Sequence, residues 1–167
     1  MLEEWIEGIS IRGRMAYSLI CLETACCKWQ IESTEMSATL SKFWEFTISM
    51  SLDVWDVEAQ RTQPYLYAFY DEFQEAKEWR GMAEEWGFDT LPDSQQEALG
   101  RMLVLLHGPA GNLFAGFDSY VTADPLIELI NIMLTAGLDL PDRSRVTLSR
   151  VEESGGWGIP HPREYFM

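Results

Sequence analysis

Apolar residues recur every three or four positions over much of the chain, which is the spacing of one face of an α-helix. From residue 10 to residue 29 this stripe consists of Ile11, Met15, Leu19, Leu22 and Cys26. A second stripe runs from about residue 34 to about residue 50, through Met36, Leu40, Phe43, Trp44 and Ile48, and Ser33 or Thr34 can cap the free amides at its start. Both segments are predicted to be helices that bury one face.

Two further segments combine helical spacing with residues that start and stop helices. The third predicted helix begins with proline and covers residues 64–86, with Gly87 as its stop. The fourth starts at Asp93 or Ser94, which has Gln or Glu three residues later as in a capping box, and it ends at residues 107–109. Both are expected to pack against the first two.

A fifth helix is predicted over residues 125–136, with Asp124 as its N-cap and Gly137 just beyond its end. Glycine and proline predict a loop at residues 108–120 and an irregular tail over residues 138–167, in which a short strand at 145–151 would lack a partner strand. The fold class is therefore all-α. We expect a single domain over residues 1–167, in which a bundle of five or six helices over residues 1–137 carries the Gly/Pro-rich tail.

The charge of the chain is far from balanced. Its 167 residues include 27 Asp and Glu against 12 Lys and Arg, which gives a net charge of −15. Eighteen of the 27 acids lie in residues 43–142, and the stretch from Met102 to Asp142 contains no Lys or Arg. This field repels polyanions, so binding to nucleic acid or to an anionic membrane is not expected and a basic protein partner is favoured.

Targeting and redox signals are those of a cytoplasmic protein. The first five residues are acidic where a secretory signal would be basic, and the longest apolar runs, such as residues 102–106, are too short to span a membrane. Three cysteines, Cys21, Cys26 and Cys27, lie within one apolar stretch, which favours reduced thiols over a disulfide framework.

Residues for catalysis or metal binding are scarce. His107 ends a predicted helix and His161 lies between two prolines, and neither has the His-Glu-x-x-His spacing of a zinc hydrolase. Neither glycine cluster, at residues 108–111 or 155–158, is followed by the Gly-Lys-Ser/Thr of a phosphate-binding loop. No catalytic residue, metal or cofactor is therefore expected. Arg12 and Arg14 are expected to form an internal pair with a carboxylate such as Glu23, which would be structural.

Aromatic residues make up 13% of the chain, and several adjoin carboxylates. Rings that the core does not need would form aromatic anchors with an acidic rim, which is a surface suited to a basic partner. Core packing is the simpler explanation for any single ring. The candidate partner-binding residues are Glu45, Asp53, Trp55, Asp56, Tyr70, Asp71, Glu72, Glu75, Glu78, Glu84, Glu85 and Trp86.

The opening segment resembles a known family. Residues 5–23, WIEGISIRGRMAYSLICLE, look like the first helix of small all-helical immunity proteins from bacterial polymorphic-toxin systems. The size of the chain, its acidity and the segment Gly156-Trp157-Gly158 add support. The resemblance implies a protein that binds and neutralises a cognate toxin domain with a basic surface. It also implies that this toxin domain is a nuclease. It implies no particular toxin-contacting residue.

Three other classes remain open from the sequence. A DNA-mimic regulator would have regularly spaced charges and would bind many DNA-binding proteins. An adaptor would expose a large apolar patch and form an oligomer, although the sequence leaves the oligomeric state undetermined. A small enzyme would hold His107 or His161 near carboxylates in a concave pocket.

Overall fold

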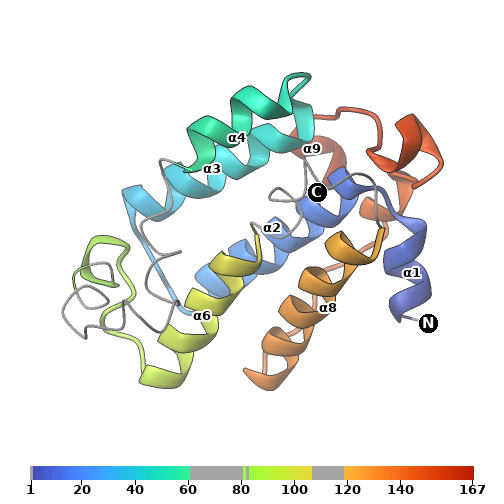
Figure 1. The fold of residues 1–167 in the computed structure, drawn as a ribbon. Coiled ribbons are helices and arrows are strands. Elements are labelled where there is room, and N and C mark those ends of the chain that lie inside the picture. The colour runs from blue at the N-terminus through green and yellow to red at the C-terminus, as the bar shows by residue number, and fades with distance from the viewer. Residues whose placement is uncertain (1, 61–80, 82, 107–118) are drawn as a thin grey trace.

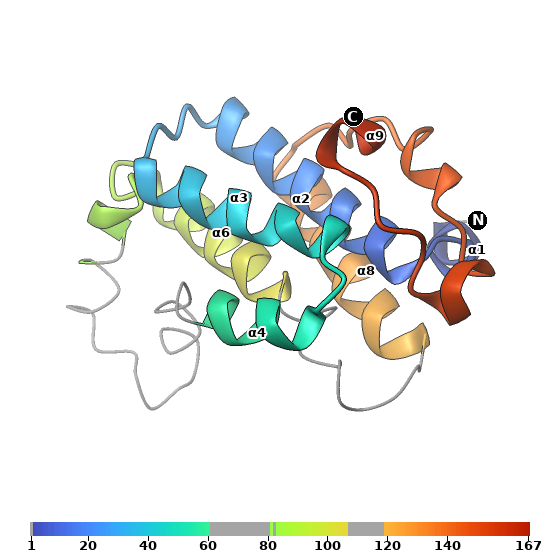
Figure 2. The same ribbon diagram turned by 90° about the horizontal axis from the view of Figure 1, so that it is seen from above.

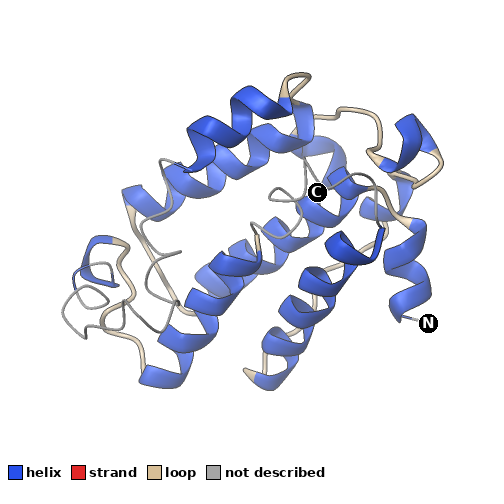
Figure 3. Cartoon of the chain, in the orientation of Figure 1, coloured by secondary structure: helices blue, strands red, loops and turns tan. Residues whose placement is uncertain are grey.

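The computed structural model describes residues 2–60, 81, 83–106 and 119–167. This part of the chain is helical and contains no strand, so the all-α prediction is confirmed for it (Figures 1 and 3). Its elements, in chain order, are the α-helices and 3₁₀ turns α1 (Leu2–Gly8), α2 (Ile11–Lys28), α3 (Thr34–Ile48), α4 (Leu52–Gln60), α6 (Asp93–Leu105), α8 (Ser119–Thr135), η2 (Val146–Leu148), η3 (Glu153–Gly156) and α9 (Arg163–Phe166). No helix in the described residues is long and apolar enough to cross a membrane.

Helix α2 lies at the centre of the molecule. It packs against α3, α6, α8 and α9 and against the tail turn η2, and Figures 1 and 2 show these elements on different sides of it. The predicted stripe is therefore only part of its buried surface. Between Ile11 and Leu22, every residue except Ile20 is buried, including Arg12 and Arg14. A helix covered on all sides has no polar face to solvent.

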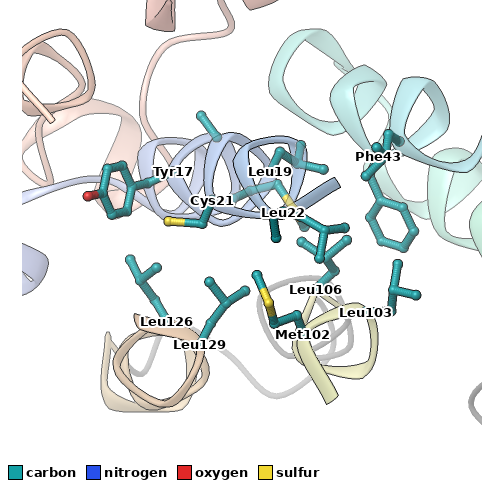
Figure 4. Close-up of a cluster of buried hydrophobic side chains, with 14 of the residues drawn as sticks. Tyr17, Leu19, Cys21, Leu22, Phe43, Met102, Leu103, Leu106, Leu126 and Leu129 are labelled. Atoms are coloured by element: carbon teal, nitrogen blue, oxygen red, sulfur yellow. The ribbon is translucent and has the colours of Figure 1, made fainter. Parts of the chain in front are cut away.

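The core joins α2 to the helices around it. Figure 4 shows apolar side chains from α2, α3, α6 and α8 that point toward one another. Those with 0% exposure include Leu19, Leu22, Phe43, Met102, Leu103, Leu106, Leu126 and Leu129. Fully burying one such side chain stabilises the fold by roughly 1.5–3 kcal/mol, before the entropy of ordering it is counted.

Several predicted helix ends are confirmed. The Ser33 hydroxyl caps α3 by accepting a hydrogen bond from the Met36 amide at 3.2 Å. The chain leaves α8 at Gly137, which has a φ of +71° that glycine adopts without a steric penalty.

The capping box predicted for α6 is wrong, although the helix does begin at Asp93. Its N-cap is Pro92, and no side chain caps the first turn. The side-chain amide of Gln96 instead donates hydrogen bonds from Nε2 to the carbonyl oxygens of Leu91 at 2.7 Å and Asp89 at 3.2 Å. Gln96 therefore holds the segment that leads into the helix.

Helix α8 begins six residues earlier than predicted, at Ser119. Pro125 lies inside the helix rather than in its first turn, and Asp124 is not its N-cap. A proline in this position removes one backbone hydrogen bond. The helix is retained because it packs against α1, α2 and α6, and this packing outweighs the local cost.

Two helices outside the C-terminal segment, α1 and α4, have no counterpart among the predictions. Each is short, seven and nine residues respectively, and so offers too few turns for a periodic pattern. Most of the helix predicted over residues 64–86 lies outside the described residues. The loop predicted over residues 108–120 also lies outside them, except for residues 119 and 120, which belong to α8. At the end of the predicted helix, residues 83–85 are helical and Gly87 has a φ of +75°.

The C-terminal segment, residues 138–167, contains two 3₁₀ turns and one short helix. The strand considered for residues 145–151 does not form, since Val146–Leu148 is a 3₁₀ turn and only Arg150 makes a β-bridge, with Ile9. The segment also bonds to the start of α2. The Ser10 amide donates to the Ser149 carbonyl at 2.9 Å, and the Arg12 amide donates to the Trp157 carbonyl at 3.2 Å.

Candidate partner-binding surface

The two arginines of α2 serve the fold. Arg12 donates to the carbonyl oxygens of Phe46 and Ser49, the latter at 2.7 Å, which lie at the C-terminal end of α3. Arg14 donates to the Ile6 carbonyl at 3.0 Å and to the Thr122 hydroxyl. Burial lowers the pKa of both guanidinium groups. A cation is favourable beside the free carbonyls that end a helix, so the two arginines join α2 to its neighbours.

The predicted pairing of these arginines with Glu23 is wrong. Glu23 accepts hydrogen bonds from the Trp44 indole at 2.8 Å and from Arg163 at 3.0 Å. The Arg163 guanidinium also lies 5.4 Å from the centre of the Trp44 ring. The carboxylate is thus used to fasten α9 to α2 and α3.

Two of the three rings proposed as surface anchors belong to the core. Trp55 and Trp86 are each 3% exposed, and Asp56, also proposed, is 8% exposed. The Trp55 indole donates to the Lys42 carbonyl at 2.8 Å and packs edge-on against Phe43 and Phe46, with ring centres 5.7 and 5.0 Å apart. A ring of this size buries more apolar area than any other side chain of α4, so it anchors that helix on α3.

A second group of candidates comes from the segment between α4 and α6. Tyr70, Asp71, Glu72, Glu75 and Glu78 all lie outside the described residues. Their part in any surface stays a prediction.

The remaining candidates are exposed carboxylates on two parts of the molecule. Glu45 and Asp53 lie on α3 and α4, while Glu84 and Glu85 precede α6. Glu45 contacts the Lys42 ammonium at 2.7 Å, and Glu58 of α4 contacts the same ammonium. Hydrogen bonds to these two carboxylates raise the pKa of Lys42. Among the described residues, one cation is thus shared between two acids on this surface.

The fold brings Glu84 and Glu85 next to acids from a distant segment. The Ser33 hydroxyl lies 3.3 Å from the Glu85 carbonyl, and a Cβ built on Gly87 would lie 3.1 Å from the Ser33 Cβ. Glu32 and Glu35 flank Ser33. We call the four exposed carboxylates Glu32, Glu35, Glu84 and Glu85 the acidic end. In Figures 1 and 2 it lies where the α2–α3 connection meets the segment before α6.

Among the residues that the structure describes, no Lys or Arg pairs with the carboxylates of the acidic end, which therefore act on solvent and on approaching molecules. The sequence predicts Glu84 and Glu85 as partner-binding residues but not Glu32 and Glu35. Their proximity depends on contacts between residues 52 positions apart, which no local pattern encodes.

A groove of about 650 Å³ lies between α2, α3 and α9. Its lining includes the Glu23–Arg163 pair, Lys28 and the exposed thiol of Cys27. His161 is not part of it: its ring stacks on Tyr165 with centres 3.7 Å apart. The described residues contain no group of His, Cys, Asp and Glu that could hold a metal ion, and His107 lies outside them.

The described residues form a mostly helical fold, and exposed carboxylates cluster on the surface of this acidic chain. Comparisons with protein-family models, with curated proteins and with solved structures gave no match.

Proposed function

We propose that this protein is an immunity protein, which binds and neutralises a cognate bacterial toxin that has a basic surface. The toxin is expected to be a nuclease. The observation that carries the proposal is the acidic end, where two distant segments present Glu32, Glu35, Glu84 and Glu85 to solvent. The net charge of −15 extends this field over the molecule.

The proposed mechanism is occlusion without chemistry. A nuclease binds its substrate through cations that contact phosphate, so its cleft attracts a dense set of carboxylates. Long-range attraction speeds encounter, and carboxylates then compete with phosphate for the same cations. Because the acids are exposed, salt should weaken this attraction beyond a Debye length of about 8 Å at physiological ionic strength.

The resemblance over residues 5–23 adds separate support. The structure places this segment against the other segment that carried the resemblance, since the Arg12 amide bonds the Trp157 carbonyl. Gly158 comes so close to Ser10 that a Cβ would lie 2.2 Å from the serine hydroxyl. The two segments thus pack together as one structural unit.

The test is protection of cells from the toxin domain encoded beside the gene for this protein. Co-expression of the wild-type protein should restore growth. A variant with E32K, E35K, E84K and E85K should associate with the purified toxin domain at least about 10-fold more slowly at low salt, and the difference should shrink as salt is added. The control reverses four exposed acids elsewhere, Glu3, Asp139, Glu152 and Glu164.

The possible results separate the claims. If the wild-type protein does not protect cells, the proposed function is wrong. If both quadruple variants associate at the same rate, the acidic end is not what attracts the toxin. Equal binding of the wild-type protein to several unrelated DNA-binding proteins would indicate a DNA mimic instead.

A further inference from the structure

Aliphatic side chains gather at the corner where α3 passes into α4, and they are exposed. Met50 is 84% exposed, Val57 57%, Val54 55% and Ile48 49%. We call these four residues the α3–α4 corner. Isolated exposed aliphatics are ordinary, but four within ten consecutive residues form a surface feature.

Folding does not account for the two valines of α4. This helix packs on α3 through Trp55, and its Ala59 is also buried, whereas Val54 and Val57 are three residues apart and lie together on its solvent side. Valine also has a lower helix propensity than alanine or the long polar residues that usually occupy exposed helix positions. Their presence there suggests a role other than stabilising the helix.

Carboxylates adjoin these aliphatic residues. Helix α4 contains Asp53, Asp56 and Glu58 and no Lys or Arg, and both Asp53 and Glu58 are exposed beside a valine. On the α3 side Glu45 is exposed, and the Lys42 ammonium is shared between Glu45 and Glu58. In the described residues, exposed carboxylates therefore adjoin the exposed aliphatic side chains on this surface.

The C-terminal segment reaches the same end of α3. The His161 amide donates to the Thr47 carbonyl at 3.0 Å, and the Thr47 hydroxyl donates to the His161 carbonyl at 2.9 Å. Ile159, two residues earlier, is 45% exposed. Figure 2 shows this part of the tail running beside the end of α3. The tail thus carries an exposed aliphatic residue two positions before the residue that bonds to the end of α3.

We propose that the α3–α4 corner is the surface that contacts the toxin, and that it fits a basic protein surface in which Lys and Arg surround an apolar hollow. This inference rests on the proposed function and adds the contact to it: the acidic end attracts the toxin at a distance, and the corner forms the water-excluding centre of the complex. Interfaces of this kind have an apolar core and a polar rim, and a few central residues carry most of the affinity.

Charge decides between a basic partner and a second copy of this chain. Two copies that met through their corners would bring Glu45, Asp53 and Glu58 of each against the same acids of the other, and each chain carries a net charge of −15. Like charges juxtaposed in an interface oppose association. A basic rim on the partner makes the same contacts favourable.

The experiment replaces the apolar centre and keeps the fold. The variant is V54K/V57K, and the matched control is L134K/L148K, because Leu134 and Leu148 are 53% and 51% exposed on other elements. Affinity for the toxin domain is measured by calorimetry, and circular dichroism checks that helix content is unchanged. V54K/V57K should weaken binding at least about 100-fold, while the control should stay within about threefold.

A second variant separates lost apolar contact from added charge. V54A/V57A leaves the rim intact and removes apolar area without adding a cation. It should weaken binding about 10-fold and leave the salt dependence of the association rate unchanged. If V54A/V57A bound as tightly as the wild-type protein and the weakening by V54K/V57K disappeared at high salt, only charge would act here, and the corner would not be the apolar centre of the interface.

The outcomes distinguish this inference from the proposed function. If the wild-type protein protects cells and V54K/V57K binds and protects equally well, the corner is the wrong surface and the immunity function stands. If the wild-type protein does not bind the toxin, the proposed function is wrong. The inference about the corner can then still be tested: an amphipathic Leu/Lys peptide should shift the NMR amide signals of Val54 and Val57 and not that of Leu134. A dimer that V54K/V57K dissociates would assign the corner to a second copy and overturn the basic partner.

Discussion

At the scale of single residues, Gly158 shows how the tail depends on the start of α2. Its φ is +80°, and a Cβ there would lie 2.2 Å from the Ser10 hydroxyl oxygen and 2.6 Å from the Ser10 Cβ. The Gly158→Ala variant therefore combines backbone strain with a clash against a buried residue. We expect it to lower the free energy of unfolding by about 3 kcal/mol, measured by urea denaturation.

Gly155 supplies the matched control for this prediction. Its φ is +62°, and nothing lies within 4 Å of a Cβ built on it. Gly155→Ala should therefore cost only the backbone strain, about 1 kcal/mol. Equal losses for the two variants would contradict the close packing of the tail on Ser10.

The cysteines make a second prediction at this scale. Cys21 and Cys26 are buried, and Cys27 is exposed. Burial raises the pKa of Cys26 to about 12 and also raises that of Cys21, so both thiols stay protonated at about pH 8, where the thiolate is the reactive form. A disulfide reagent with a coloured product should therefore modify one thiol quickly in the native protein and three after unfolding. Cys27→Ser should abolish the fast phase; a fast phase that survives it would contradict this assignment.

At the scale of elements, the confirmed predictions rest on local chemistry. Ser33 caps α3 because its own hydroxyl reaches an amide three residues on, and Gly137 ends α8 because its backbone favours positive φ. Helix α4 was missed because nine residues hold too little periodicity, and Trp55 was misassigned to the surface because ring type does not reveal which side of a helix is covered.

Helix α8 yields a prediction that depends on its internal proline. Pro125 lies six residues into the helix and cannot donate a backbone hydrogen bond. Pro125→Ala should restore that bond and raise the free energy of unfolding by about 1–3 kcal/mol, seen as a higher melting temperature. In the control Pro92→Ala, at the N-cap of α6, no helix-internal bond is missing and stability should change by less than about 0.5 kcal/mol. A destabilised P125A protein would place the start of the helix at the proline.

At the scale of the whole molecule, the net charge of −15 opposes the compact state through self-repulsion. Salt screens this repulsion, so raising NaCl from about 0.02 M to about 0.5 M should raise the melting temperature by several degrees. The E32K/E35K/E84K/E85K variant should melt higher at low salt and respond less to salt, because the repulsion is reduced. A melting temperature that does not change with salt would show that repulsion is not significant.

The sequence by itself determined the helical class, the acidity and several helix ends, since these depend on composition, spacing and side chains next to one another in the chain. Tertiary structure decided which residues are available to a partner. It buried Trp55 and Trp86, turned Arg12 and Arg14 toward helix carbonyls, and placed Glu32 and Glu35 beside Glu84 and Glu85. The exposure of a residue depends on which distant elements pack against it. The energy of these long-range contacts is not encoded in any local sequence pattern.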